Sequence, residues 1–183
     1  MKVKKTLLVI PIFLVSVLLG YRVIRVNQLY PQVKKVDVEL GKEQYITDAI
    51  TMKVISKNMI SKEVAEKDFG IDFVKEMEGA GDYWVVDVLA EFKNNSDQKE
   101  CLTLYDNYIE TSNYGNGLAP EAFDVLSSGE NMQRILNAYE TYEVHLGYVL
   151  CEIQFAKGQW ENINNEKFYL VNQRYPIKYY WEL

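Results

Sequence analysis

The sequence is poor in metal-binding and nucleophilic residues, since it has one histidine, His145, and two cysteines, Cys101 and Cys151. These three residues fall short of the four ligands of a structural zinc site. His145 and Cys151 are six positions apart, and on one strand that spacing separates them by about 20 Å, too far for a nucleophile and its base. We therefore expect no metal, no cofactor and no enzyme of the Cys–His type.

Linkers and internal repeats are also missing. The sequence has 4 prolines and 10 glycines, and no Pro-, Gly- or Ser-rich stretch divides the chain after its first 29 residues. The remainder, about 150 residues, is enough to bury a sizeable core in one domain. The sequence therefore predicts an N-terminal segment at residues 1–29 and one globular domain at residues 30–183.

Basic residues are scarce in this second part. Of the 20 Lys and Arg residues, five lie in residues 1–29, which hold no Asp or Glu, so the rest carries 15 basic against 26 acidic residues, a net charge of −11. Such a surface repels phosphates, which excludes nucleic acid as an expected partner and disfavours anionic lipid or wall polymer. An acidic surface also serves solubility, without any partner.

A long apolar run lies near the N-terminus. Residues 6–21 carry no charge, basic residues flank them on both sides, and Val23 and Ile24 extend the run. As a helix, residues 6–21 cover about 24 Å, which with this extension approaches the thickness of a bilayer core. We therefore expect residues 6–24 to cross the membrane as an uncleaved single-pass anchor. Pro11 does not oppose this, because a membrane helix tolerates proline.

Two other interpretations of this run stay open, a cleaved signal peptide and a buried soluble helix. Leu18 and Leu19 occupy positions before Gly20 where a signal peptidase prefers small residues, which favours the uncleaved anchor. The basic residues on the two sides balance, so charge alone does not set the orientation. We expect residues 30–183 to lie outside the cytoplasm, because a lone apolar segment at the N-terminus acts as an export signal. Since no cysteine precedes Cys101, we expect no lipid-modified N-terminus.

Composition and periodicity favour strands. Hydrophobic residues make up 48% of the chain and aromatic residues 13%, which speaks against a disordered tail. The clearest strand is Tyr83–Phe92, in which apolar residues alternate with Asp87 and Glu91, and it ends at the turn-forming residues 94–97. One short helix is expected at Ser61–Lys67. The other expected strands are Lys34–Leu40, Ala49–Lys57, one beginning near Cys101, Met132–Leu136, Val144–Phe155, Lys167–Val171 and Ile177–Leu183. About seven strands separated by glycine-containing turns predict a β-sandwich.

A resemblance to known proteins rests on three segments: Tyr83–Asn95 (YWVVDVLAEFKNN), the Gly129–Glu130 turn and Phe168–Leu183 (FYLVNQRYPIKYYWEL). They resemble segments of uncharacterised signal-anchored or secreted single-domain proteins of Gram-positive bacteria, which are similar to the bacterial immunoprotective extracellular domain. The resemblance implies an all-β, immunoglobulin-like antiparallel sandwich of about seven strands with one short helix. It also implies an extracytoplasmic location, and it supplies no catalytic residue.

Cys101 and Cys151 raise the question of a disulfide. An exported domain with an even number of cysteines can hold one, and a bond across these 50 residues would contribute about 4 kcal/mol. Both cysteines lie in apolar strand contexts, where a free cysteine also serves as a small core residue. A Cys101–Cys151 disulfide is therefore a hypothesis, and free thiols are the alternative.

Tyrosine is the remaining lead. Tyr105, Tyr108 and Tyr114 lie in one stretch that also contains Asn and Gly, which predicts a loop. Exposed tyrosines suit contact with a protein or a glycan, because the ring is rigid and apolar and its tip is polar. Buried ones belong to a sandwich core. We mark these three as candidate contact residues.

The apolar N-terminal segment and the lack of a catalytic motif together predict a membrane-tethered, extracytoplasmic binding or interaction module that is not an enzyme. Its partner would be an envelope protein or a glycan. One alternative is an accessory or immunity-type envelope protein of structural role. Another is a hydrolase of envelope polymers, which would need two carboxylates facing each other across a cleft.

Overall fold

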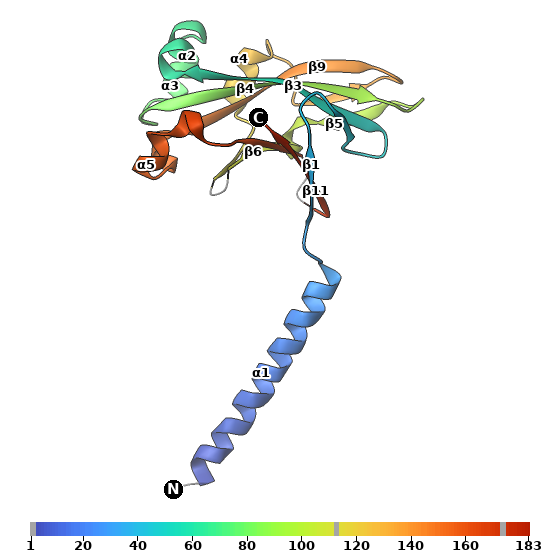
Figure 1. The fold of residues 1–183 in the computed structure, drawn as a ribbon, viewed down its shortest axis with the longest axis vertical. Helices are drawn as coiled ribbons and strands as arrows, with labels where there is room; N and C mark the ends of the chain where they lie inside the picture. Colours follow the sequence, from blue (N-terminus) through green and yellow to red (C-terminus); the bar gives the residue numbers. More distant parts are fainter. Residues whose placement is uncertain (1–2, 112–113, 173–174) are drawn as a thin grey trace. The chain divides into compact units, whose positions relative to one another are not determined.

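The computed structural model describes residues 3–111, 114–172 and 175–183, with side chains from residue 12 onward. The chain divides into two compact units, residues 1–34 and 35–183. The first consists mainly of helix α1 (Val3–Leu29), and the second, called the body below, holds the sheets and the shorter helices (Figure 1).

Helix α1 contains the whole of the segment expected in the membrane, residues 6–24. Within it, residues 12–29 are long and apolar enough to cross a membrane, with a mean hydropathy of 1.4, and none of this window is buried. The helix has 27 residues, about 40 Å at 1.5 Å per residue, whereas a bilayer core is about 30 Å thick. Its length and composition therefore fit a membrane span or a signal sequence.

The body contains three sheets with eleven strands in the part of the chain that the structure describes. A five-stranded sheet has the order β1-β11-β10-β6-β7, a four-stranded sheet has the order β2-β3-β4-β9, and β5 and β8 form a two-stranded ribbon. The strands are β1 (Lys34–Val38), β2 (Glu43–Tyr45), β3 (Ile50–Ser61), β4 (Tyr83–Asn94), β5 (Glu100–Thr103), β6 (Asn107–Glu110), β7 (Gly115–Gly117), β8 (Gln133–Leu136), β9 (Thr141–Cys151), β10 (Tyr169–Asn172) and β11 (Ile177–Glu182).

The two larger sheets form the layers of a β-sandwich (Figure 1). One buried cluster joins them: it includes Met52, Val88 and Leu146 from the four-stranded sheet and Ile109 and Trp181 from the five-stranded sheet, all 0% exposed. Burying each such side chain contributes roughly 1.5–3 kcal/mol, so this shared core holds the layers together.

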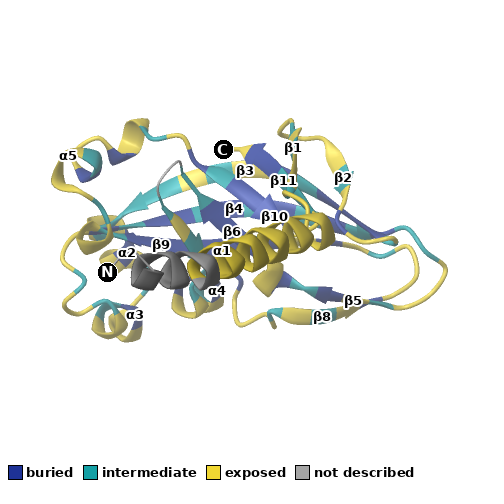
Figure 2. Cartoon of the chain, turned by 90° about the horizontal axis from the view of Figure 1, so that it is seen from below, coloured by how far each residue is buried: buried dark blue, intermediate teal, exposed yellow. Residues whose placement is uncertain are grey.

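Strand β4 shows the predicted alternation. Val86, Val88, Ala90 and Phe92 are all 0% exposed and face the core, while Asp87 on the opposite face is partly exposed. Figure 2 shows buried residues along β4 in dark blue. The alternation of apolar and polar residues therefore correctly predicted β4, an interior strand of the four-stranded sheet.

The opposite face of this sheet is covered at one end by short helices. Ala65, Phe73 and Ala122, one from each of three helices, pack on Tyr83 and Val149 in a second buried cluster. The short helices are α2 (Lys62–Asp68), α3 (Ile71–Glu76), α4 (Pro120–Leu126) and α5 (Lys157–Trp160).

Most of the predicted elements are present, but several more exist. Every predicted strand is found, and α2 confirms the helix expected at Ser61–Lys67. The expectations of about seven strands and one short helix were too low, since β2, β6, β7 and α3 to α5 carry weak patterns or few residues. Strand β9 ends at Cys151 rather than Phe155, because the chain then forms the 3₁₀ turn η2 (Glu152–Gln154).

Candidate functional site

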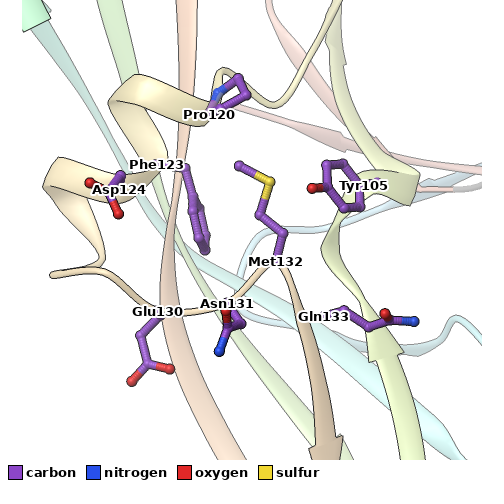
Figure 3. A pocket seen from close by; sticks show the side chains of 8 residues that line it. All are labelled: Tyr105, Pro120, Phe123, Asp124, Glu130, Asn131, Met132 and Gln133. Carbon is purple, nitrogen blue, oxygen red and sulfur yellow. The ribbon is translucent and has the colours of Figure 1, made fainter.

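A groove opens on the body between helix α4, the start of strand β8 and the 3₁₀ turn η1 (Leu104–Asp106) (Figure 3). Its volume is about 600 Å³. Eight residues line it: Tyr105, Pro120, Phe123, Asp124, Glu130, Asn131, Met132 and Gln133. We refer to it as the α4–β8 groove.

Close backbone contact holds helix α4 against strand β9. Gly147 of β9 has no side chain, and a Cβ there would lie 2.7 Å from the carbonyl carbon of Ala122. The N–H of Ala119 donates to the carbonyl oxygen of Gly147 at 2.9 Å. Pro120 lies in the first helical turn, where its missing N–H costs nothing. These contacts fix the helix that carries Phe123 into the groove.

The segment around α4 also closes the free edge of β9. The Oγ atom of Ser127 donates to the carbonyl oxygen of His145 at 2.6 Å. The Nδ2 atom of Asn116 donates to the carbonyl oxygen of Val149 at 2.7 Å. Together with the bond at Gly147, these contacts occupy three alternate carbonyls along one edge. Since a bare edge invites pairing with other chains, this closure protects the sheet and anchors the wall of the groove.

The groove has an apolar floor and a polar rim. Phe123 is buried and belongs to the sandwich core, and Met132 packs against that core while remaining partly exposed. Tyr105 lies across from Asp124 and Glu130, and 63% of it is exposed (Figure 3). Both charged residues that line the groove are acidic. The site therefore combines apolar contact area with negative charge.

Arg134 connects the rim to a cluster beside it. Its guanidinium lies 3.2 Å from Glu130 Oε2 and 3.1 Å from Glu140 Oε1, and 4.2 Å from the ring centroid of Tyr142. Glu140 also accepts hydrogen bonds from the backbone N–H and the side chain of Asn137, each at 2.8 Å. The Asn137 N–H, followed by Arg134, lowers the pKa of Glu140 below its ordinary value. Glu130 is thus shared between the groove and this ion-pair cluster.

Of the three candidate tyrosines, only Tyr105 lines this groove. Tyr108 lies on strand β6 rather than in a loop and is buried, with Lys178 Nζ 5.3 Å from its ring centroid. The Tyr114 hydroxyl donates to Gln154 Oε1 at 2.8 Å, and burial raises the pKa of Tyr114 to about 12. The three rings have separate surroundings and do not form one contact surface.

A second, smaller hollow of about 310 Å³ lies beside β6 and β7 and includes Tyr108, Glu110 and Lys178. The Nζ atom of Lys178 lies 2.6 Å from Oε1 of Glu110, and the Tyr180 hydroxyl donates to Oε2 of Glu110 at 3.3 Å. Burial opposes the charge of Lys178, but its hydrogen bonds to Glu110 and to tyrosine hydroxyls raise its pKa above the ordinary value. Because Lys178 and Glu110 neutralise each other, we interpret this cluster as a structural ion pair.

The structure records Cys101 and Cys151 as free cysteines, so the bridge considered from the sequence is not formed. Cys151 pairs with Tyr83 at the first residue of β4, whereas Cys101 lies in β5, which follows the turn after the last residue of β4. The two ends of this strand are about 36 Å apart at 3.3 Å per residue. Cys101 is exposed rather than part of the core, and Cys151 is half-buried.

His145 lies on β9 with its Nδ1 atom 2.8 Å from Oδ1 of Asp87 on β4. Strand β9 continues through Gly147 without a turn. His145 and Cys151 therefore lie about 20 Å apart along the strand, too far for a nucleophile and its base. Burial raises the pKa of the Cys151 thiol, which opposes thiolate formation. Within the described ranges, no group of three or more His, Cys, Asp or Glu side chains is placed to hold a metal ion.

Sequence reasoning did not find most of the groove. Phe123 and Asp124 come from a helix that periodicity did not predict, and Glu130 lies in the Gly129–Glu130 turn, which was identified from the sequence but not as part of a site. A usable signal was present at Pro120, because proline is favoured in the first turn of a helix. The proximity of Tyr105 to these residues is set by the fold alone.

The chain belongs to a family described as a domain of unknown function (DUF5028), whose model matches residues 27–179. No curated protein matches the chain.

Three solved structures are similar to this chain. An uncharacterized β-sandwich protein from Clostridium difficile 630 is 13% identical, with 83% of this chain and 96% of that chain covered and a TM-score of 0.48. A conserved hypothetical protein from Bacillus anthracis is 15% identical, with 73% and 87% covered and a TM-score of 0.47. A functionally unknown protein from Listeria monocytogenes EGD-e is 14% identical, with 72% and 71% covered and a TM-score of 0.44. At these values no property of theirs is transferred to this chain.

Proposed function

We propose that this member of the DUF5028 family is a membrane-tethered, extracytoplasmic binding module without enzymatic activity, and that the α4–β8 groove is its binding site. The observation that carries the proposal is the exposed ring of Tyr105 beside a groove with an apolar floor. Ligand sites in proteins have volumes of about 300–1,000 Å³, and the groove falls within this range. Tyrosine is also a favoured contact residue in binding surfaces.

The proposed location at the membrane rests on helix α1. An apolar helix near the N-terminus supports an uncleaved single-pass anchor with the body outside, and secretion after signal cleavage is the alternative. Recovery of the intact 21.3 kDa chain from membranes would support the anchor. Labelling of exposed Cys101 by a membrane-impermeant maleimide in intact cells would place the body outside. An intact chain found free in the cytosol would refute the address.

An immunoglobulin-like topology is part of the proposal, and strand order supports it. Immunoglobulin sandwiches have strands A, B and E adjacent in one sheet and C, F and G adjacent in the other. Here β3, β4 and β9 stand in the A-B-E order, and β6, β10 and β11 stand in the C-F-G order. The groove then lies beside strand E, where α4 covers the sheet edge.

The surroundings of the reactive groups support a non-enzymatic role. His145 is paired with Asp87, and Cys151 is half-buried and distant along the same strand. One observation favours the alternative of a polymer hydrolase, since Asp124 and Glu130 both line the groove. The carboxylate of Glu130, however, is already engaged by Arg134 at 3.2 Å, so the two acids do not stand free across a cleft. An accessory or immunity-type envelope protein remains the other alternative.

The test is a capture experiment with the full chain in detergent micelles and solubilised cell envelope of the bacterium that encodes it. We expect a saturable partner that is lost with Tyr105→Ala and retained with Tyr45→Ala, because Tyr45 is 51% exposed on β2, outside the groove. Absence of any partner, or equal loss with both variants, would refute the groove as a binding site. Turnover of peptidoglycan that is lost with Asp124→Asn would support the hydrolase instead.

A further inference from the structure

We propose that the α4–β8 groove binds the side chain of a lysine or arginine that belongs to a polypeptide partner. This inference rests on the proposed function, because it names the class of ligand for the same groove.

The charges around the groove favour a cation. In the part of the chain that the structure describes, Asp124 forms no ion pair, and its carboxylate stands at the rim (Figure 3). Glu130 stands on the same rim and shares its carboxylate with Arg134 at 3.2 Å. A ligand cation would therefore meet one unpaired and one shared carboxylate. The net charge of −11 after residue 29 attracts a basic partner and repels an acidic one.

The floor of the groove suits the stem of such a side chain. Lysine and arginine carry three or four methylene groups that pack on apolar surfaces while the charged end stays hydrated. Met132, which is partly exposed, provides that apolar surface, and buried Phe123 packs beneath it. Tyr105, with its exposed ring on the opposite side, offers a face for a cation–π contact. Apolar floor, aromatic wall and acidic rim match the successive parts of one long basic side chain.

The side-chain amide of Asn131 at the rim favours a polypeptide over a free amine. Asn131 and Gln133 line the groove and are both exposed. Each side-chain amide can donate and accept hydrogen bonds, as a peptide backbone on either side of the basic residue requires. A small amine would leave the Asn131 amide unused, whereas Nε2 of Gln133 already donates to Cys101 Sγ at 3.5 Å.

The test uses fluorescence anisotropy with the full chain in nanodiscs of phosphatidylcholine, whose neutral surface does not attract basic peptides. The probe is a fluorescein-labelled peptide of sequence Gly-Ser-Lys-Ser-Lys-Ser-Gly, compared with the same peptide carrying Glu in place of Lys. We expect saturable binding of the Lys peptide alone, weakened by added salt. Asp124→Asn and Tyr105→Ala should each raise the Kd by about two- to fivefold, as expected for one exposed charge pair or cation–π contact.

Matched variants separate the groove from the general charge of the body. Asp48→Asn removes the same charge from the exposed β2–β3 turn, and Tyr45→Ala removes an exposed ring from β2. Neither should change the Kd. An equal effect of Asp48→Asn and Asp124→Asn would overturn the inference in favour of diffuse attraction. Because Asp124→Asn keeps the shape of the side chain, unchanged circular dichroism confirms that the fold is retained.

Further outcomes distinguish this inference from the proposed function. Similar binding of the Lys and Glu peptides would overturn the basic ligand. Competition by free cadaverine as strong as that by unlabelled peptide would overturn the polypeptide partner. A Tyr105-dependent envelope partner without any binding of the Lys peptide would leave the proposed function standing and refute the inference. Failure of both capture and peptide binding would refute both.

Discussion

A Cβ atom at Gly147 would stand 2.7 Å from the carbonyl carbon of Ala122, because strand β9 and helix α4 touch through their backbones. The backbone nitrogen of Phe123 would lie at 2.8 Å from the same Cβ. Both contacts are far inside van der Waals distance, and no side-chain rotation can relieve them. The position of α4, and with it one wall of the groove, therefore depends on a glycine in the neighbouring strand.

Gly147→Ala is expected to lower the free energy of unfolding by about 1–3 kcal/mol, since the added methyl group must push α4 away from β9. Urea unfolding of the full chain in detergent, followed by fluorescence of its 3 tryptophans, measures this change. Gly117→Ala is the control, because a Cβ at this strand position has nothing within 4 Å. Equal unfolding midpoints for the two variants would show that α4 is not held by this contact.

Asn94→Ala is expected to lower the free energy of unfolding by about 2 kcal/mol or more, because it removes a side chain that is 0% exposed together with its hydrogen bonds to three backbone groups. The Nδ2 atom of Asn94 donates to the carbonyl oxygens of Gln98 at 2.7 Å and Asn137 at 2.9 Å, and Oδ1 accepts from the N–H of Ser96 at 2.9 Å. Chemical unfolding measures the loss. Asn95→Ala serves as a partly buried control, and an equal or larger loss there would contradict the central role of Asn94.

Glu140→Gln is expected to reduce stability at neutral pH and to change the acid side of the stability curve. Because the pKa of Glu140 is lowered from its ordinary value of 4.5, its carboxylate stabilises the folded chain above that value. This contribution is lost as the pH falls through the lower folded pKa. The difference between wild type and variant should therefore close in acid.

Unfolding midpoints measured from about pH 7 to about pH 3 test this dependence. Glu78→Gln, at an exposed glutamate in the turn after α3, is the control and should follow the wild type throughout. A gap between wild type and Glu140→Gln that stays constant with pH would contradict the assignment to the Glu140 carboxylate.

The two cysteines are expected to react at different rates and without prior reduction. Cys101 is exposed, while Cys151 is half-buried and burial raises the pKa of its thiol. Since the thiolate is the reactive form, iodoacetamide should modify Cys101 first, and the rate at Cys151 should rise further as the pH increases. Mass spectrometry of Cys101→Ser and Cys151→Ser assigns the sites. Thiols that react only after reduction would show a disulfide instead.

Strand periodicity succeeded where one face of a strand meets a large core. In β4, apolar residues every second position, from Val86 to Phe92, have no alternative to facing the other sheet. The turn after Asn94 was equally readable, because asparagine bonds its own backbone. Helix α2 was found from its helix-forming residues and the serine before them, but the Ser61 side chain forms no capping hydrogen bond.

Short strands and helices were missed because they form only through contacts with residues that are distant in the sequence. Strand β6 begins with buried Asn107, a residue typical of loops, whose Oδ1 accepts a hydrogen bond from Asn172 Nδ2 at 2.9 Å. The pairing of β6 with β10, 65 positions apart at these two residues, provides that partner. No local pattern around Tyr108 carries this information, so the region was expected to be a loop.

The amino-acid sequence by itself determined the apolar N-terminal helix, the acidic body and most strands of the sandwich, because charge, hydropathy and the alternation of side chains are local properties of the chain. Only the tertiary structure decided which tyrosine faces a groove, that Cys101 and Cys151 are kept apart, and that Asp124 and Glu130 share a rim with Tyr105. These relationships join residues that are distant in sequence, and the packing of α4 and β8 against the sandwich brings them together.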